Sequence, residues 1–248
     1  MTVVESDALI TGAARRRSPS LRDVAREFWR HPSPWIITAL LVGATVARLV
    51  VGDWIWTDAL VVGVMVAAFP FYEWLIHVFL LHWRPKRIGR LTLDPAVARK
   101  HRLHHADPRN IPLVFIPWRV LARIVPVDIA IALFAFPRVG LGLTFLAMIA
   151  GTGLAYEWSH YLIHTDYRPV SRPYRAIWRH HRLHHYKNEH YWFGVSTSGV
   201  SDRVLRTAPD PAQTATSPTV RDLHAREAGY PPSGEGVKAR EQCGSAGT

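Results

Sequence analysis

The sequence repeats a histidine-dense pentapeptide, and histidine is the residue in it that can do chemistry. HRLHH occurs at His101–His105 and again at His181–His185. Imidazole nitrogens bind Zn, Cu, Fe and Ni, so ligand type alone does not choose among these metals. The single cysteine, Cys243, excludes a disulfide framework and a thiolate metal site. Any metal must therefore be held by His, Asp or Glu.

The repeated unit is longer than five residues. YEWLIHVFLLHWRP, from Tyr72, matches YEWSHYLIHTDYRP, from Tyr156. In each half an apolar stretch ends in Tyr-Glu-Trp, two histidines and an Arg-Pro follow, and a basic connector leads to His-x-x-His-His. The histidines of the two halves are His77, His82, His101, His104 and His105, then His160, His164, His181, His184 and His185.

The spacing of these histidines places most of them on shared helical faces. A residue advances about 100° around a helix, so positions three or four apart share a face. Each HRLHH therefore projects its three histidines to one side, and so does the pair His160 and His164. His77 and His82 are five apart, and they converge only if the helix ends there, is distorted, or serves two centres.

The number of histidines indicates two metal ions. A structural zinc site closes with four ligands, and ten histidines exceed one such site. Two ions with about five nitrogens each would leave positions open, which suits iron that activates O2. Glu73 and Glu157 are candidates to orient the ring N–H groups of the ligands, or else to pair with a neighbouring arginine.

Long apolar stretches predict that the chain spans a membrane. The first runs from Pro34 to Val51, and the second ends in the first histidine pair. A third span is expected at about Val120–Phe136, although it contains Pro126 and Asp128. The fourth runs from Leu141 to the second histidine pair. Four spans place both histidine regions and both termini on one face, and the basic residues of 83–112 indicate that this face is cytoplasmic.

Charge and composition agree with one membrane domain and two tails. The chain has 248 residues, 30 Lys and Arg and 19 Asp and Glu, a formal net charge of +11. A basic cytoplasmic surface accounts for this excess, so we expect no nucleic-acid partner. We predict a cytosolic tail at 1–33, the membrane domain at 34–206, and a disordered tail at 207–248, where large apolar residues are few.

These motifs resemble the fatty acid hydroxylase and sterol desaturase superfamily of integral-membrane non-haem di-iron oxygenases. From about Phe69 to Thr207, the order of EWLIHVFLLH, HRLHHADPRNIPLVFIP, HYLIH and HRLHHYKNEHYWFGVSTSGVSDRVLRT is most similar to the fatty acid 2-hydroxylase branch. The resemblance implies an all-α bundle of about four transmembrane helices with a cytosolic histidine-rich cap. It also implies that the ten histidines bind two Fe ions, with Zn a possible occupant of the purified protein.

The resemblance further implies a lipid substrate, O2 and an external electron donor. The family often has Trp before the Asp of its closing segment, where this chain has Ser201 before Asp202. We see no cytochrome b5-like segment, so we expect a separate ferredoxin or cytochrome b5-type protein to dock on the basic face. Hydroxylation of a fatty acyl chain is the favoured reaction. The alternatives are a sterol or carotenoid hydroxylase or desaturase, and a non-enzymatic zinc-binding or metal-transport protein.

Overall fold

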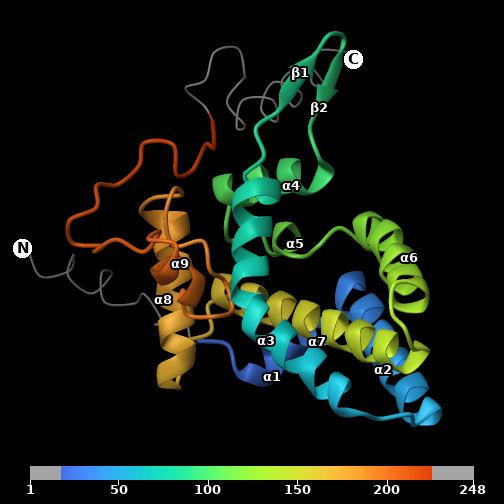
Figure 1. Ribbon diagram of the computed structural model, residues 1–248. Helices are drawn as coiled ribbons and strands as arrows, with labels where there is room; N and C mark the ends of the chain where they lie inside the picture. The colour runs from blue at the N-terminus through green and yellow to red at the C-terminus, as the bar shows by residue number, and fades with distance from the viewer. Residues whose placement is uncertain (1–17, 225–248) are drawn as a thin grey trace, which may run out of the picture.

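The computed structural model describes residues 18–224, which are mostly helical, as the all-α prediction requires (Figure 1). Parts of the two predicted tails, residues 1–17 and 225–248 with Cys243, lie outside the described residues. The elements, in chain order, are α1 (Leu21–Phe28), α2 (Pro32–Val51), α3 (Trp56–Leu75), the π-helix η2 (Ile76–Leu81), β1 (Lys86–Ile88), β2 (Leu91–Leu93), α4 (Ala96–Ala106), α5 (Ile111–Val114), α6 (Trp118–Phe134), α7 (Val139–His164), α8 (Arg172–Tyr186) and α9 (Val200–Val204).

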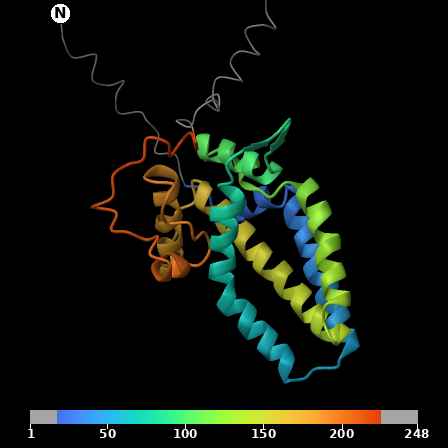
Figure 2. The same ribbon diagram turned by 45° about the horizontal axis from the view of Figure 1, so that its top comes forward.

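Three of the described helices are long and apolar enough to cross a membrane. They are α2, α3 with its continuation η2, and α7. The predicted third span corresponds to α6, which has 17 residues and is shorter than the ~20 that a full span needs. It ends at Phe134, close to Pro137, where helix extension is disfavoured. Since α6 packs against α2 and α7, the four helices form one bundle (Figure 2).

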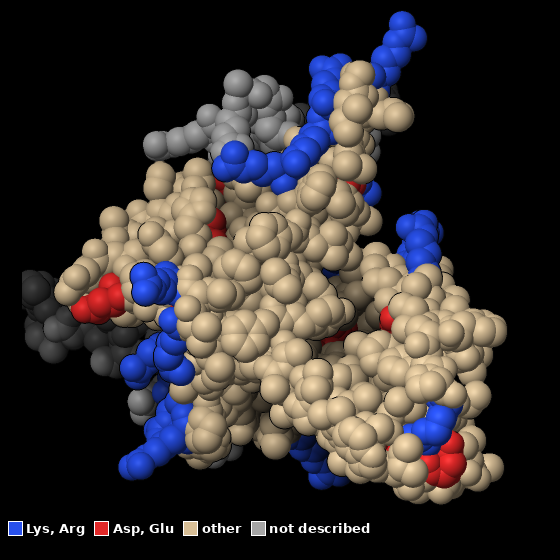
Figure 3. Space-filling view, in the orientation of Figure 1, with Lys and Arg blue, Asp and Glu red and all other residues tan. Residues whose placement is uncertain are grey.

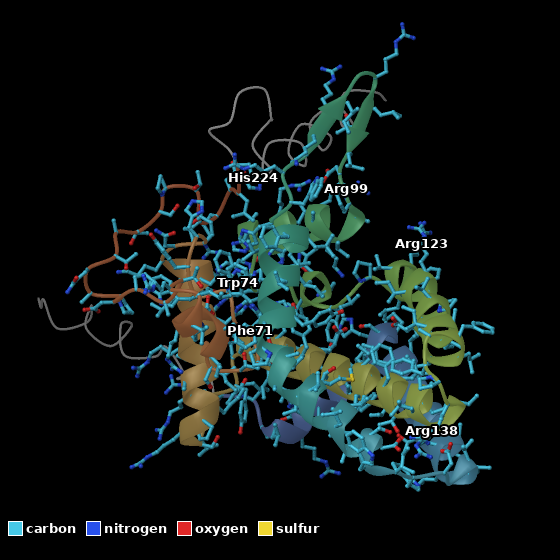
Figure 4. The ribbon with its side chains drawn as sticks, viewed as in Figure 1. Phe71, Trp74, Arg99, Arg123, Arg138 and His224 are labelled. Carbon is cyan, nitrogen blue, oxygen red and sulfur yellow. The ribbon has the colours of Figure 1, made fainter. Side chains whose placement is uncertain are left out.

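A buried ionic network joins α2, α3 and α7 at the end of the bundle away from the histidines. Arg48 is 2% exposed, and its Nη2 donates to Asp58 Oδ1 at 2.9 Å. The Thr144 hydroxyl donates to the same oxygen at 2.6 Å. Arg138, which Figure 4 labels at this end, reaches Asp58 Oδ2 at 2.7 Å. Asp58 thus joins α3 both to α2 and to the start of α7.

Replacing Asp58 by Ala should destabilise the bundle, because it leaves Arg48 buried without its main partner. We expect a loss of about 2–3 kcal/mol in the free energy of unfolding, measured by chemical unfolding in mixed micelles. Asp53→Ala is the matched control: it also removes a carboxylate from Arg48, but the Asp53 side chain is 41% exposed and Arg48 keeps its buried partner Asp58, so the loss should be smaller. Equal losses in the two variants would contradict the role given to Asp58.

The segment before the first span packs on the bundle within the described residues. Ser20 caps α1, and its hydroxyl accepts a hydrogen bond from the Asp23 amide. Phe28 is 2% exposed, and its ring centroid lies 5.4 Å from that of Tyr161 in α7. The Tyr161 hydroxyl donates to the Val24 carbonyl at 2.8 Å. Apolar contacts therefore cross the boundary predicted at residue 33, a feature that the polar composition of the tail concealed.

The described part of the C-terminal segment also lies against the histidine region. The Trp192 amide donates to the Thr207 carbonyl at 2.8 Å, and the Ser217 amide donates to the Lys187 carbonyl at 2.7 Å. Val220 and Leu223 are buried. The composition of 207–248 predicted disorder, whereas residues 207–224 are held by backbone hydrogen bonds and by these two apolar side chains.

A short β-hairpin projects from the body between the first histidine pair and α4 (Figure 1). Its strands pair antiparallel, with Lys86 opposite Leu93 and Ile88 opposite Leu91. Gly89, at φ +60°, occupies the left-handed region in the turn, which glycine adopts without strain. Every residue of the two strands is exposed.

Candidate metal centre

The two HRLHH triads lie on two separate short helices, α4 and α8. Ser171 begins α8 as its N-cap, and its hydroxyl accepts a hydrogen bond from the Tyr174 amide. Pro173 follows in the first turn, where its fixed φ favours a helix. The histidines at positions one, four and five of each HRLHH pentapeptide are buried. Each helix therefore presents its three imidazoles to the interior, as the spacing predicted.

The ten histidines form two clusters of five. Within each cluster the nearest ring nitrogens all lie within 4.8 Å of one another. The first cluster contains His77, His82, His101, His105 and His184, and the second contains His104, His160, His164, His181 and His185. All are buried except His82, which is partly exposed.

The two halves of the sequence exchange one ligand each. Four members of the first cluster come from the first half, and the fifth is His184 of the second HRLHH. Conversely, His104 of the first HRLHH belongs to the second cluster. The two exchanged residues, His104 and His184, are each the fourth residue of their HRLHH pentapeptide. The sequence repeat predicted the ten residues, but a repeat alone does not show which histidines meet.

A π-helix accounts for the uneven spacing of the two histidine pairs. The His82 amide donates to the His77 carbonyl at 3.0 Å, the i to i+5 bond that defines a π-helix. The wider turn brings the two rings to one side, with centroids 5.0 Å apart. In α7, the regular i to i+4 pair His160 and His164 has a centroid distance of 4.9 Å. One distorted turn thus makes the two pairs equivalent.

The distances between ring nitrogens fit a shared metal ion. In the first cluster, His77 Nε2 and His101 Nε2 lie 3.2 Å apart, and His82 Nε2 and His184 Nε2 lie 3.1 Å apart. In the second, the Nε2 atoms of His181 and His185 are 3.0 Å apart. With metal–nitrogen bonds of about 2.1 Å, adjacent octahedral ligands lie ~3.0 Å apart and opposite ligands ~4.2 Å apart. The distances between neighbouring nitrogens match the first of these values.

The charge state of the rings also suits a metal. Burial, reinforced by the neighbouring imidazoles, lowers the pKa of the histidines on α4 and α8 well below its usual value. For His105 the pKa falls to about 3. These imidazoles are neutral near pH 7, so their lone pairs are available. His160 Nε2 is buried without a hydrogen-bond partner in the part of the chain that the structure describes. A metal ion would satisfy such an atom.

Backbone carbonyls orient several of the rings. His77 Nδ1 lies 2.6 Å from the Phe193 carbonyl oxygen, and His184 Nδ1 lies 2.8 Å from that of Tyr191. His105 Nδ1 lies 3.2 Å from the Val220 carbonyl. An N–H donated from Nδ1 turns Nε2 toward the cluster, the usual arrangement around a metal-binding histidine. Because backbone carbonyls occur at every residue, no sequence signal marks these partners.

Glu73 and Glu157 bind elsewhere than predicted. Glu73 accepts hydrogen bonds from the Val195 and Ser196 amides, and so ties the segment after α8 to α3. Glu157 accepts from the Ser33 hydroxyl and the Ile116 amide. Among the described residues, no hydrogen bond or ion pair joins either carboxylate to a histidine ring or to an arginine. Both carboxylates therefore brace the chain around the clusters.

Asp202 organises the closing segment beneath the first cluster. Its Oδ1 accepts from the Phe193 amide at 2.9 Å, and its Oδ2 accepts from the Gly194 amide at 2.7 Å. Burial works to raise the pKa of Asp202, but these bonds and those from His180 and Thr207 outweigh it and lower the pKa. Ser201, where the family often has Trp, is fully buried. A carboxylate thus fixes the Phe193 carbonyl that orients His77.

An apolar cavity between the membrane helices reaches the histidine region. Its volume is about 220 Å³, and it lies among α2, α3, α6 and α7. Figure 3 shows the surface hollowed between α3 and α6. Ile76 of η2, Val97 of α4 and Tyr156 of α7 line it, and these elements also carry clustered histidines. The Tyr156 ring centroid lies 5.5 Å from that of His160. Sequence reasoning missed Tyr156 as a lining residue.

The sequence profile described as "Fatty acid hydroxylase" matches residues 62–207, more than half of the chain. The chain belongs to the fatty acid hydroxylase family. It is therefore an oxidoreductase of that family, an integral membrane protein with two histidine clusters suited to two metals. This membership favours an enzyme over the non-enzymatic alternative.

A solved structure shares the fold of this hydroxylase-family protein. It is full-length scs7p, in which only the hydroxylase domain is visible. The two share 19% sequence identity, with a TM-score of 0.59 over 75% of this chain and 70% of that chain. No curated protein sequence matches the chain.

Double substitutions should reveal the exchanged ligand through metal binding. His104→Ala with His164→Ala removes two members of the second cluster, so one site of wild-type affinity should remain per chain. His104→Ala with His101→Ala, both in the first HRLHH, should leave no such site, because each cluster loses one ligand. Metal content after a chelator challenge measures the outcome. His190→Ala, a histidine outside both clusters with a 64% exposed side chain, is the control. Identical retention in the two double variants would contradict the exchange.

Proposed function

We propose that this protein is a di-iron monooxygenase that hydroxylates a C–H bond of a lipid, in particular of a fatty acyl chain. The observation that carries the proposal is the apolar cavity among the spans, which is bounded in part by η2, α4 and α7, elements that carry histidines of the two clusters. An acyl chain dissolved in the bilayer has the shape and polarity to enter between α3 and α6. Two iron ions held by the clusters would supply the O2-activating chemistry that an unactivated C–H bond requires.

The residues of the chain have separate tasks in this reaction. The ten clustered histidines hold the metals, and the Phe193, Tyr191 and Val220 carbonyls orient three of their rings. The cavity excludes water from the reacting carbon because its lining is mostly apolar. Each turnover converts C–H and O2 to C–OH and water, and consumes two electrons and two protons. A separate ferredoxin or cytochrome b5-type protein supplies the electrons.

We further propose that the histidine clusters face the cytoplasm. The spans place both clusters at one end of the bundle, and basic residues predominate in 83–112 at this end. The order of the four motifs supports the fatty acid 2-hydroxylase branch.

Replacing His104 or His184 by Ala should abolish hydroxylation while leaving membrane insertion intact, because each variant removes one ligand from a buried cluster. Untargeted lipid mass spectrometry of an expression host, searching for a gain of one oxygen, measures the result. His190→Ala should keep activity. Fully active His104 and His184 variants would contradict the proposal, and a loss of two hydrogens from the lipid would favour a desaturase.

Narrowing the cavity should shorten the acyl chain that the enzyme accepts. Ile124 of α6 lines the cavity, whereas Val127, one turn later, does not and is 56% exposed. Ile124→Trp should shift the products toward shorter chains, while Val127→Trp adds the same bulk outside the cavity and should leave the distribution unchanged. The chain-length distribution of the products is the measurement. An equal shift in both variants would contradict the role of the cavity.

A further inference from the structure

A second cavity lies on the outer side of α8, and arginines surround it. Its volume is about 520 Å³, and it is formed by α8, α9 and the segments that flank α9. Arg172, Arg175 and Arg179 of α8 and Arg203 of α9 line it. Leu183 provides part of an apolar wall. Figure 3 shows basic side chains gathered along this side of the molecule. We call this surface the arginine pocket.

The stability of α8 does not explain these arginines. Arg172, Arg175 and Arg179 follow one another at spacings of three and four, so they form one stripe of like charge. Arg172 also lies in the first turn of α8, which has no acidic residue, and a cation there opposes the helix dipole. Among the described residues, the four arginines form no ion pair. Their arrangement favours an anionic partner from outside the chain.

The arginine pocket is connected to both histidine clusters. His180 lines it, and the next residue, His181, belongs to the second cluster. A chain of hydrogen bonds leads to the first cluster. His180 Nε2 lies 2.8 Å from Asp202 Oδ2, and the same oxygen accepts from the Gly194 amide at 2.7 Å. The carbonyl of that peptide group, on Phe193, lies 2.6 Å from His77 Nδ1.

The backbone at Gly199 packs directly against the His180 ring. Gly199, at φ +68°, approaches the His180 ring so closely that a Cβ on it would lie 2.1 Å from His180 Cε1. A side chain at residue 199 would therefore displace His180 from Asp202.

We propose that the arginine pocket docks the acidic electron-transfer protein that reduces the metal centre, a [2Fe–2S] ferredoxin. This inference rests on the proposed function, which requires two electrons per turnover. A ferredoxin carries one electron, so two reduced molecules dock in succession and each gives up one electron. The two protons come from water. The arginines attract the acidic carrier, and His180 places the pocket one residue from a metal-binding helix face.

The β-hairpin is the competing basic surface. It carries Lys86, Arg87 and Arg90, yet it projects from the body and exposes Ile88 and Leu91 at 64% and 76%. Within residues 18–224, none of the hairpin side chains forms a hydrogen bond or ring contact with a clustered histidine. A surface that binds only anionic lipid needs no connection to the metal-binding histidines. A docking surface for an electron donor does need such a connection, and the arginine pocket is connected to them through His180.

Charge reversal at the two surfaces separates them. One variant carries Arg172→Glu, Arg175→Glu and Arg179→Glu, and the matched control carries Lys86→Glu, Arg87→Glu and Arg90→Glu, with the same change in net charge. Both are purified, loaded with iron and placed in zwitterionic lipid nanodiscs, and their metal content is compared with that of the wild type. Binding of a plant-type [2Fe–2S] ferredoxin is titrated, and lipid product is measured with the reduced ferredoxin or with dithionite.

The α8 variant should raise the Kd for ferredoxin about tenfold or more, and the hairpin variant less than about threefold. Product formation with dithionite should be equal in all three proteins. A second α8 variant, with Gln at the three positions, keeps helix propensity and should weaken binding by an intermediate factor. If the Glu variant loses metal, ferredoxin binding by the Gln variant tests the docking site instead.

Equal weakening by the two Glu variants would overturn the docking site, because it would reflect only the overall charge. Unchanged ferredoxin binding with lost binding to anionic vesicles would also overturn it, in favour of a membrane surface. Selective loss of ferredoxin binding, in a protein that hydroxylates no lipid with either reductant, would support the docking site and contradict the proposed function.

Discussion

The structure depends on packing ten imidazoles into two adjoining buried clusters. Neutral imidazoles in contact satisfy few of one another's nitrogens, so the arrangement is costly without a bound cation. The energy of metal binding then becomes folding energy for the surrounding segments. Each cluster takes ligands from the spans and from both α4 and α8, so metal ions bound there would hold α3, α4, α7 and α8 together. The exchange of His104 and His184 links the two halves in the same way.

The remaining elements keep the clusters in place beside the membrane. Glu73 and Glu157 fasten neighbouring segments to α3 and α7, and Asp202 holds the carbonyl that orients His77. At the other end of the bundle, Asp58 joins α3 to α2 and to the start of α7. The apolar cavity lies between these two ends. The lipid-facing surface and the arginine pocket approach the clusters from different sides, so substrate and electron donor need not compete.

The sequence predicted the ten histidines because their spacing is a property of the chain itself. Helical periodicity was sufficient to predict that the histidines of each triad, and His160 with His164, share a face. His77 and His82 meet through a π-helical turn, which helical periodicity does not predict. The exchange of ligands depends on how α4 and α8 cross, which is a tertiary property. Glu73 and Glu157 were placed at the metals because carboxylates often orient ligands, whereas here backbone carbonyls of Tyr191, Phe193 and Val220 lie beside ring nitrogens. Polar composition likewise hid the packing of residues 18–31 and 207–224.

The central claim is that each cluster holds one metal ion through imidazole nitrogens. Iron K-edge X-ray absorption of the purified protein, combined with its iron content, measures this directly. The account predicts about two iron ions per chain, each with a first shell of about five nitrogen or oxygen atoms at roughly 2.1 Å and with the outer-shell scattering of imidazole rings. One iron per chain, or a first shell without imidazole scattering, would contradict it.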